Sequence, residues 1–440
     1  NGRELTGALI DSSGYVGIIS SVAAGNTNVP ITFSYDDIDI RSPQFAGEVS
    51  EWPQARDITG VDRTVEIRAE GLKRRLTQGA SPEWSALRRW LQSSIDDYNP
   101  FATPRAYWSL EDGPQAVTLA VKPTTGSGSL YFVPPTTGTT PGRITWGAAK
   151  DLPGSLQSPT LTGGGSLVGA VPGLPDTGWG IAWVERMSTE SGSYTKFDTA
   201  NGAIVVGLIV DPGTPNVLNV YLTSAPFTGL IMTVTFADEA AVDDVWHTYY
   251  LRAEQSGADV IFLLDVDGAL ADSYTQTTLT LNKLGRFQFS SPASASTDTA
   301  IGHIGLWDSD VSSLDIHDAS LGFPGELALL RLHRLCRERG VEFDWFGWFN
   351  ADPDGNYDSP PMGPQRVDTL IGLLEDCAAV DGGILYEQRT LAAFQYRTLR
   401  TLLSRAAWAT LALTGTADDH ELSGVWAPTS DDRNVNNEVS

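Results

Sequence analysis

The sequence predicts an α+β domain that is interrupted by an all-β sandwich. Residues 101–311 are rich in Thr, Ser, Gly and Pro and nearly free of helical periodicity, a pattern that favours strands. In the two flanking segments, apolar residues return to helical spacing beside short alternating runs. Because residues 1–100 and 312–440 share this α+β character, we predict one discontinuous domain that carries the sandwich as an insertion.

Length and charge limit the number of domains and the choice of partners. The 440 residues exceed one ordinary core, and 54 acidic against 29 basic side chains give a net charge of −25. This charge opposes approach to phosphate backbones and anionic lipid, so sequence-specific nucleic-acid binding is not expected. No apolar run approaches the roughly 18 residues of a membrane span. Cys336 and Cys377 match no metal-ligand spacing and are predicted to be free, buried thiols.

Short alternating runs in the first segment predict the strands of a small, β-barrel-like domain. They lie at residues 31–35, 45–49 and 64–69. A helix is expected next, with Ser81 as its N-cap and Pro82 at its first position. The apolar stripe of this helix comprises Trp84, Leu87, Leu91 and Ile95.

The clearest signal within residues 101–311 is a β-hairpin with strands at 243–252 and 260–268. Apolar residues alternate along the second strand, and Asp267-Gly268 ends it with a pair suited to positive φ. The run 203–210 predicts a further buried strand.

Helical stripes dominate the last segment. Leu329, Leu332 and Cys336 follow i, i+3, i+7 spacing on a helix that Gly340 ends. Strands are expected at 383–387 and 393–397. A second helix ends before Gly382-Gly383 and carries the stripe Val367, Leu370, Ile371, Leu374 and Ala378.

The hairpin pattern Trp246-His247, followed by Asp265-Val266-Asp267-Gly268, resembles laminin-G and concanavalin-A-like domains. In that family a Trp-His strand precedes a strand that ends in an Asp-Gly turn. The resemblance implies a β-sandwich and a glycan as the class of ligand, and it implies no reaction.

The flanking segments resemble the minor tail or baseplate-hub proteins of siphophages that infect actinobacteria. The matching residues before the sandwich are Phe45-x-Gly47-Glu48-Val49-x-x-Trp52-Pro53 and Val65-Glu66-Ile67-x-Ala69-x-Gly71-Leu72-x-Arg74-Arg75-Leu76-x-Gln78-Gly79. Those after it are Gly325-Glu326, Arg331-Leu332-x-Arg334-Leu335, Met362-Gly363-Pro364-Gln365, Asp381-Gly382-Gly383-Ile384-Leu385-Tyr386-Glu387 and Tyr396-Arg397.

This second resemblance implies a homotrimeric hub at the virion tail tip, assembled in the host cytoplasm. Its implied partners are the distal tail protein, the tape measure protein, and other minor tail proteins or fibres. The inserted sandwich is then expected to contact a host surface glycan or neighbouring tail proteins.

No constellation for catalysis or for a cofactor is recognisable, so we expect no enzyme. The chain lacks a nucleophile elbow, a P-loop and a dinucleotide fingerprint. Asp265 and Asp267 alternate along one strand as the two carboxylates of a jelly-roll glycosidase do, but no Glu accompanies them. The histidines follow no metal-binding spacing and are assigned structural roles; they are His247, His303, His317, His333 and His420.

Two kinds of binding residue are candidates in the sandwich. Calcium prefers carboxylate and carbonyl oxygens, and the loop acids that can supply them are Asp211, Asp238, Asp308 and Asp310. An aromatic platform for a sugar is the second possibility, with Trp179, Trp183 and Tyr194, but core packing is the favoured interpretation of these residues.

An alternative to the tail protein is a secreted protein that binds or cleaves polysaccharide through a concanavalin-A-like domain. The cleaving form predicts a signal peptide and a carboxylate dyad. A bacterial surface lectin would leave helical flanks on both sides of the sandwich without explanation.

Overall fold

The computed structural model describes most of the sandwich and parts of its flanks. The described residues are 48–51, 54–56, 63–65, 68–92, 104–116, 120–121, 124–135, 142–170, 174–187, 194–199, 204–210, 217–224, 227–235, 244–291, 298–308, 310–346, 359–388 and 391–403. The predicted strand at 31–35 and the predicted helical residue Ile95 lie outside them.

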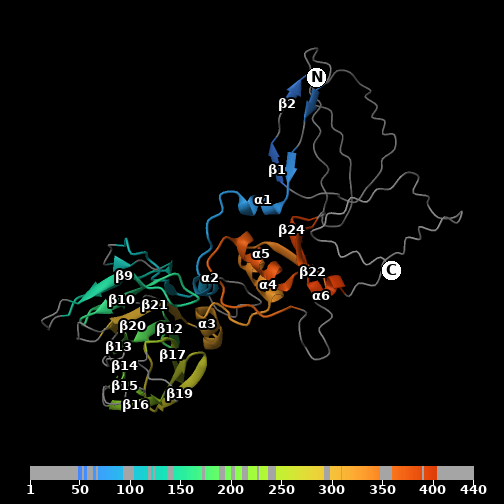
Figure 1. Cartoon of the computed structure of the whole chain (residues 1–440). Coiled ribbons are helices and arrows are strands. Elements are labelled where there is room, and N and C mark those ends of the chain that lie inside the picture. Colours follow the sequence, from blue (N-terminus) through green and yellow to red (C-terminus); the bar gives the residue numbers. More distant parts are fainter. Residues whose placement is uncertain are drawn as a thin grey trace, which may run out of the picture.

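Two large antiparallel sheets make up the sandwich (Figure 1). The nine-stranded sheet has the order β19 (Ala269–Gln276), β18 (Asp259–Val266), β17 (Trp246–Ser256), β12 (Gly178–Met187), β21 (Asp298–Trp307), β10 (Ser158–Thr162), β9 (Arg143–Ala149), with β5 (Ala106–Trp108) beside β21 and β7 (Thr125–Gly126) beside β5. The eight-stranded sheet has the order β16 (Phe227–Thr235), β15 (Val217–Ser224), β14 (Ile204–Val210), β13 (Tyr194–Thr199), β20 (Leu284–Ser290), β11 (Ser166–Ala170), β8 (Leu130–Val133), β6 (Ala120–Val121).

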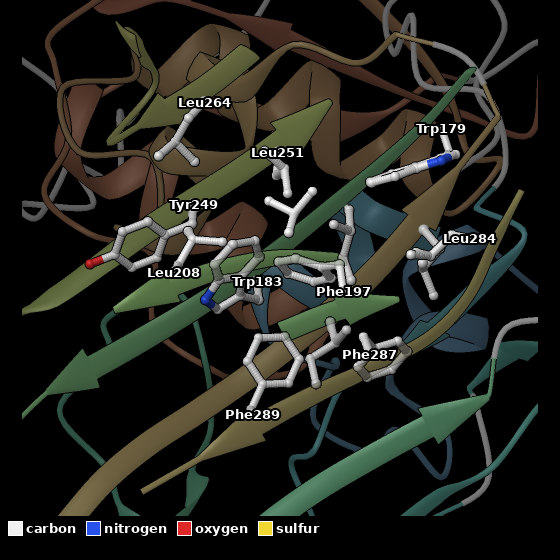
Figure 2. Packing of buried hydrophobic residues seen from close by; sticks show 14 of the residues in the cluster. Trp179, Trp183, Phe197, Leu208, Tyr249, Leu251, Leu264, Leu284, Phe287 and Phe289 are labelled. Atoms are coloured by element: carbon white, nitrogen blue, oxygen red, sulfur yellow. The ribbon is translucent and has the colours of Figure 1, made fainter. Parts of the chain in front are cut away.

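Side chains from both sheets meet in one apolar core, as the alternation of strand residues requires. Trp183 of β12 lies at its centre, 1% exposed. Its ring stacks on Tyr249 at 5.2 Å between centroids and lies 5.5 Å from Phe289 of the opposite sheet (Figure 2). The predicted all-β character of residues 101–311 is therefore seen in two packed sheets, while membership of a hub family stays a prediction.

The predicted hairpin is confirmed. Strands β17 and β18 pair with Tyr249 opposite Val266, and the chain turns between them at Gly257, where φ is +64°. Asp267 and Gly268, with φ of +50° and +80°, form the next turn, from β18 into β19.

Two short helices cover part of the outer face of the nine-stranded sheet. These are α2 (Ala86–Gln92), which precedes the sandwich, and α3 (Ser313–Ser320), which follows it. Leu87 and Ile316 pack with Trp307 in a second apolar cluster on this face. Helix α3 was not predicted from the sequence. Its N-cap Ser312 accepts a hydrogen bond from the Asp315 amide at 3.2 Å.

The predicted start of the helix before the sandwich is wrong. Helix α2 begins at Ala86, and the Ser85 hydroxyl accepts from the Arg88 amide at 3.3 Å in place of the predicted cap at Ser81. The Glu83 amide instead donates to the Asp368 carbonyl at 2.8 Å, which keeps this segment out of the helix. Trp84 is 50% exposed, so it does not belong to the buried stripe.

Segments on both sides of the sandwich share a third apolar cluster. We call this cluster, together with the helices and strands that form it, the base. Helices α4 (Ala328–Glu338) and α5 (Leu370–Asp381) pack together over a three-stranded sheet of β22 (Glu342–Phe346), β24 (Ala393–Arg397) and β23 (Ile384–Glu387). Helix α1 (Leu72–Thr77), which precedes the sandwich, contributes Leu72 and Leu76 to the same cluster. Smaller elements complete the described part: β1 (Glu48–Glu51) pairs with β4 (Arg68–Glu70), β2 (Gln54–Arg56) pairs with β3 (Arg63–Val65), and α6 (Leu399–Leu403) follows β24.

Glycines end the two long helices of the base as predicted. Gly340 and Gly382 have φ of +62° and +71°, the left-handed geometry of a helix C-cap. The predicted thiols are also confirmed: Cys336 and Cys377 are free and buried between α4 and α5. Burial raises the pKa of each thiol to about 12, so both stay protonated. Val367, by contrast, precedes α5 and is 38% exposed.

A buried network of charges ties α2, which precedes the sandwich in the sequence, to α4, which follows it. Glu338 accepts from Arg89 Nε at 2.7 Å and from Arg334 Nη1 at 2.6 Å, and its side chain is 1% exposed. Glu326 accepts from Arg331 Nε at 2.8 Å and from Arg334 Nε at 2.7 Å. These contacts join residues that precede the sandwich and residues that follow it. The sandwich lies to one side of the base (Figure 1).

Candidate functional site

A polar hollow opens on the outer face of the nine-stranded sheet, next to the part that α2 and α3 cover. Its volume is about 270 Å³. Gly178 and Gly180 of β12 lie opposite Glu254 and Arg252 of β17. The lining residues are Thr177, Gly178, Trp179, Gly180, Tyr250, Arg252, Glu254, Gln255, Asp308 and Asp310.

Missing side chains on β12 create this space. A Cβ at Gly180 would lie 2.6 Å from the Tyr250 hydroxyl oxygen, so any other residue would displace that ring. A Cβ at Gly178 would meet only the Ala253 carbonyl oxygen, at 3.6 Å, and the edge of the Glu254 side chain. The hollow was not predicted from the sequence. The signal that could have indicated it is the Gly-x-Gly spacing within a strand, since glycine in a strand marks a close approach to the backbone.

Charged groups of both signs line the hollow. Arg252 Nη1 donates to Asp310 at 2.9 Å and Nη2 to Asp265 at 3.4 Å, while its Nε has no hydrogen-bond partner among the described residues. Arg105 Nε donates to Asp308 at 2.6 Å. Burial raises the pKa of Tyr250 well above its ordinary value, so its hydroxyl stays protonated and accepts from the Val311 amide. This arrangement of donors and acceptors suits an uncharged polar ligand such as a sugar.

The two predicted alternating carboxylates have separate partners. Asp265 is 5% exposed and faces Arg252, whereas Asp267 lies in the turn after β18. Asp267 accepts from the Thr248 amide at 2.9 Å and shares a 2.6 Å contact with His247 Nδ1. Burial of Asp267 opposes its ionisation, but the hydrogen bond and charge of His247 outweigh burial and lower its pKa.

The calcium candidates do not converge in the described part of the chain. Asp308 and Asp310 are each paired with an arginine, and Asp211 and Asp238 lie outside the described residues. No three His, Cys, Asp or Glu side chains gather in a metal-binding arrangement among the residues that the structure describes.

Two of the three predicted platform aromatics are core residues. Trp179 is 3% exposed and its indole N–H donates to the Asn282 carbonyl at 3.2 Å; Trp183 is the centre of the core. Both lie on the inner face of β12, where large rings fill the space between the sheets. Tyr194 belongs to β13, and its side chain is not among those that the structure describes. Exposed aromatics are found instead at Tyr131 and Tyr221, on the other sheet.

Four histidines make structural contacts in the described part, and His420 lies outside it. His303 is fully buried, 2.7 Å from both the Tyr107 hydroxyl and the Ser155 hydroxyl. Burial lowers the pKa of His303 to about 4, so it is neutral at physiological pH. His247 and His317 contact Asp267 at the junction with α3, and His333 packs beside Phe343.

No protein-family model and no curated protein matches this sequence. Among solved structures, the chain is similar to the botulinum neurotoxin type G receptor-binding domain, with 9% identity and a TM-score of 0.34 over 51% of this chain and 52% of that one. It is also similar to the globular domain of T. cruzi calreticulin, with 11% identity and a TM-score of 0.37 over 50% of this chain and 94% of that one. The chain spans about half of the length of the toxin domains, and such low scores identify neither a family nor a ligand.

No helix in the described part of the chain is long and apolar enough to cross a membrane.

Proposed function

We propose that this chain is a structural component of a siphophage tail tip, a baseplate-hub or minor tail protein, whose sandwich contacts glycan on the host surface. One observation carries the proposal: segments on both sides of the sandwich form a single base. Leu72 of α1 packs against the apolar cluster that contains Leu374 of α5, and Arg89 of α2 is paired with Glu338 of α4. A module held in this way projects from an assembly without interrupting it.

The base supplies the assembly surface of the proposed function. We propose that it forms a homotrimer around the tail axis and contacts the distal tail protein, the tape measure protein and other minor tail proteins or fibres. Closed rings need one heterologous contact that rotation repeats, and a durable contact buries on the order of 1,600 Å².

The sandwich supplies the receptor surface, and the hollow beside Arg252 is the first candidate contact. A binding role without catalysis is favoured because Asp265 is paired with Arg252 and Asp267 with His247 and Thr248. Both carboxylates therefore have partners that account for their positions, and Asp265 is 5% exposed.

Locating the chain in virus particles tests the proposal. We expect antibody fragments against the sandwich to label one end of purified tails, at the tip, and cryo-electron microscopy to show copies of the base around the tail axis. Labelling along the tail tube or on the capsid contradicts a tail-tip role. A chain that is absent from particles but still binds polysaccharide would support the alternative, a secreted polysaccharide-binding protein.

A further inference from the structure

We propose that the outer face of the eight-stranded sheet binds an extended, uncharged polysaccharide chain that lies across the strands. This site is separate from the hollow, and it rests on the proposed function only in taking a carbohydrate as its ligand. Its centre is a line of polar side chains that we call the polar ladder: Arg286, Gln288 and Ser290 of β20, with Ser166 of β11.

Strand alternation places the polar ladder outside the core. Phe287 and Phe289 are buried between the sheets, so Arg286, Gln288 and Ser290 project from the opposite face of β20. Ser166 lies directly across from Ser290. A strand with two phenylalanines on one side and only polar groups on the other presents a hydrogen-bonding surface to its surroundings.

Hydrogen bonds fix the orientation of the ladder. Arg286 Nη2 donates to Gln288 Oε1 at 3.0 Å, and Gln288 Nε2 donates to Ser290 Oγ at 3.0 Å and to Ser166 Oγ at 3.3 Å. The two serine hydroxyls are 2.8 Å apart. The guanidinium and the amide keep further donor or acceptor capacity, while the Ser166 hydroxyl, in a residue that is 7% exposed, helps to orient them. A pre-oriented array loses little side-chain entropy when it binds.

Two exposed tyrosines lie in one cross-strand row with the ladder. The register places Tyr131 opposite Val168 and Val168 opposite Gln288. It continues through Lys196 of β13 and Gly207 of β14 to Tyr221 of β15. Tyr131 is 52% exposed and Tyr221 is 36% exposed. From β8 to β15 there are five steps between neighbouring strands, which at about 4.8 Å each span about 24 Å.

An uncharged polysaccharide is the occupant that this chemistry fits. Its hydroxyls both donate and accept, as the ladder requires, and the apolar faces of its rings can pack on Tyr131 and on Val133, which is 41% exposed. The guanidinium of Arg286 lies 3.9 Å from the carboxylate of Asp198, so these two charges offset each other beside the ladder. In a chain with a net charge of −25, an acidic polysaccharide would also be repelled at long range.

An oligosaccharide array tests this site with the 440-residue chain. The array carries neutral oligosaccharides of increasing length and counterparts of the same lengths that bear carboxylates. We expect affinity to rise with length among the neutral probes until the row is filled. Tyr131→Ala should then weaken binding of the best long probe by about three- to tenfold, and Gln288→Ala by about fivefold, in titration calorimetry.

Matched variants on the other sheet provide the controls. Leu270→Ala removes another exposed apolar side chain and Gln276→Ala another strand amide, both from β19, and neither should change affinity. A chain that binds no neutral probe, or that prefers the acidic counterparts, overturns the inference. If Glu254→Gln in the hollow abolishes binding while both ladder variants bind normally, the inference is overturned and the proposed contact with glycan stands.

Discussion

Glu338→Ala is expected to destabilise the base by about 3–5 kcal/mol. Glu338 is the carboxylate that Arg89 and Arg334 share, and these side chains are at most 9% exposed. Its removal leaves one buried guanidinium without its carboxylate and weakens the pairing of the other. Because Arg89 precedes the sandwich and Glu338 follows it, amide hydrogen exchange in α2 should also become faster.

Glu375→Ala is the matched control for this prediction. Its carboxylate also pairs with a cation, Lys73, but both side chains are more than 50% exposed. Such a surface pair contributes about 1 kcal/mol or less. Urea unfolding of both variants gives the comparison, and equal stability losses would show that the network around Glu338 does not hold the flanks together.

Glu185→Gln is expected to remove a pH-dependent loss of stability from the sandwich. Glu185 is 1% exposed, and burial raises its pKa from 4.5 to about 7, although the indole N–H of Trp183 donates to it at 3.0 Å. The folded chain therefore binds a proton between these two values that the unfolded chain has released. The stabilisation is complete below pH 4.5 and is lost as the pH rises through about 7.

The glutamine variant should match the native protein near pH 4.5 and exceed its free energy of unfolding at pH 8 by about 3 kcal/mol. His303 acts in the opposite direction in both chains, since its lowered pKa of about 4 costs stability as the pH falls from 6.5. Urea unfolding at the two pH values, monitored by tryptophan fluorescence, measures the difference in the free energy of unfolding between the two proteins. Glu254→Gln, at an exposed position, should leave it unchanged, and parallel curves for native protein and Glu185→Gln would contradict the assignment.

Elements whose signals are local could be predicted from the sequence. Helix α4 ends where Gly340 supplies a left-handed residue, and α5 ends at Gly382 for the same reason. Strand β18 was recognisable because Phe262 and Leu264 alternate with less buried residues, and both are completely buried. In each case the pattern and its cause lie within about a dozen residues.

Elements that depend on distant partners could not be predicted. The segment before α2 is held by Asp368 and by Arg339, which pairs with Glu83 at 3.2 Å, and both partners follow the sandwich. No local signal at Ser81 or Pro82 reveals those contacts. Tertiary hydrogen bonds here override the preference of these residues for a helix start.

The candidate sites show the same limit. Alternation puts Trp179 and Trp183 on one face of β12, but only the packing of the second sheet decides that this face is the inner one. The hollow needs Gly180 beside Tyr250 and Asp310, which come from three separate parts of the chain. The polar ladder could not be predicted because it depends on Ser166, which the register brings opposite Ser290 and within hydrogen-bond distance of Gln288.

Competition for the host surface is the measurement that tests the central claim most directly. Host cells are incubated with increasing amounts of the purified 440-residue chain, and the fraction of virus particles that adsorb is then counted. If the sandwich contacts the host glycan at the tail tip, the free chain should lower adsorption in proportion to the sites it occupies, and a heat-unfolded sample should have no effect. Unchanged adsorption at saturating amounts of folded chain on the cells would contradict the account.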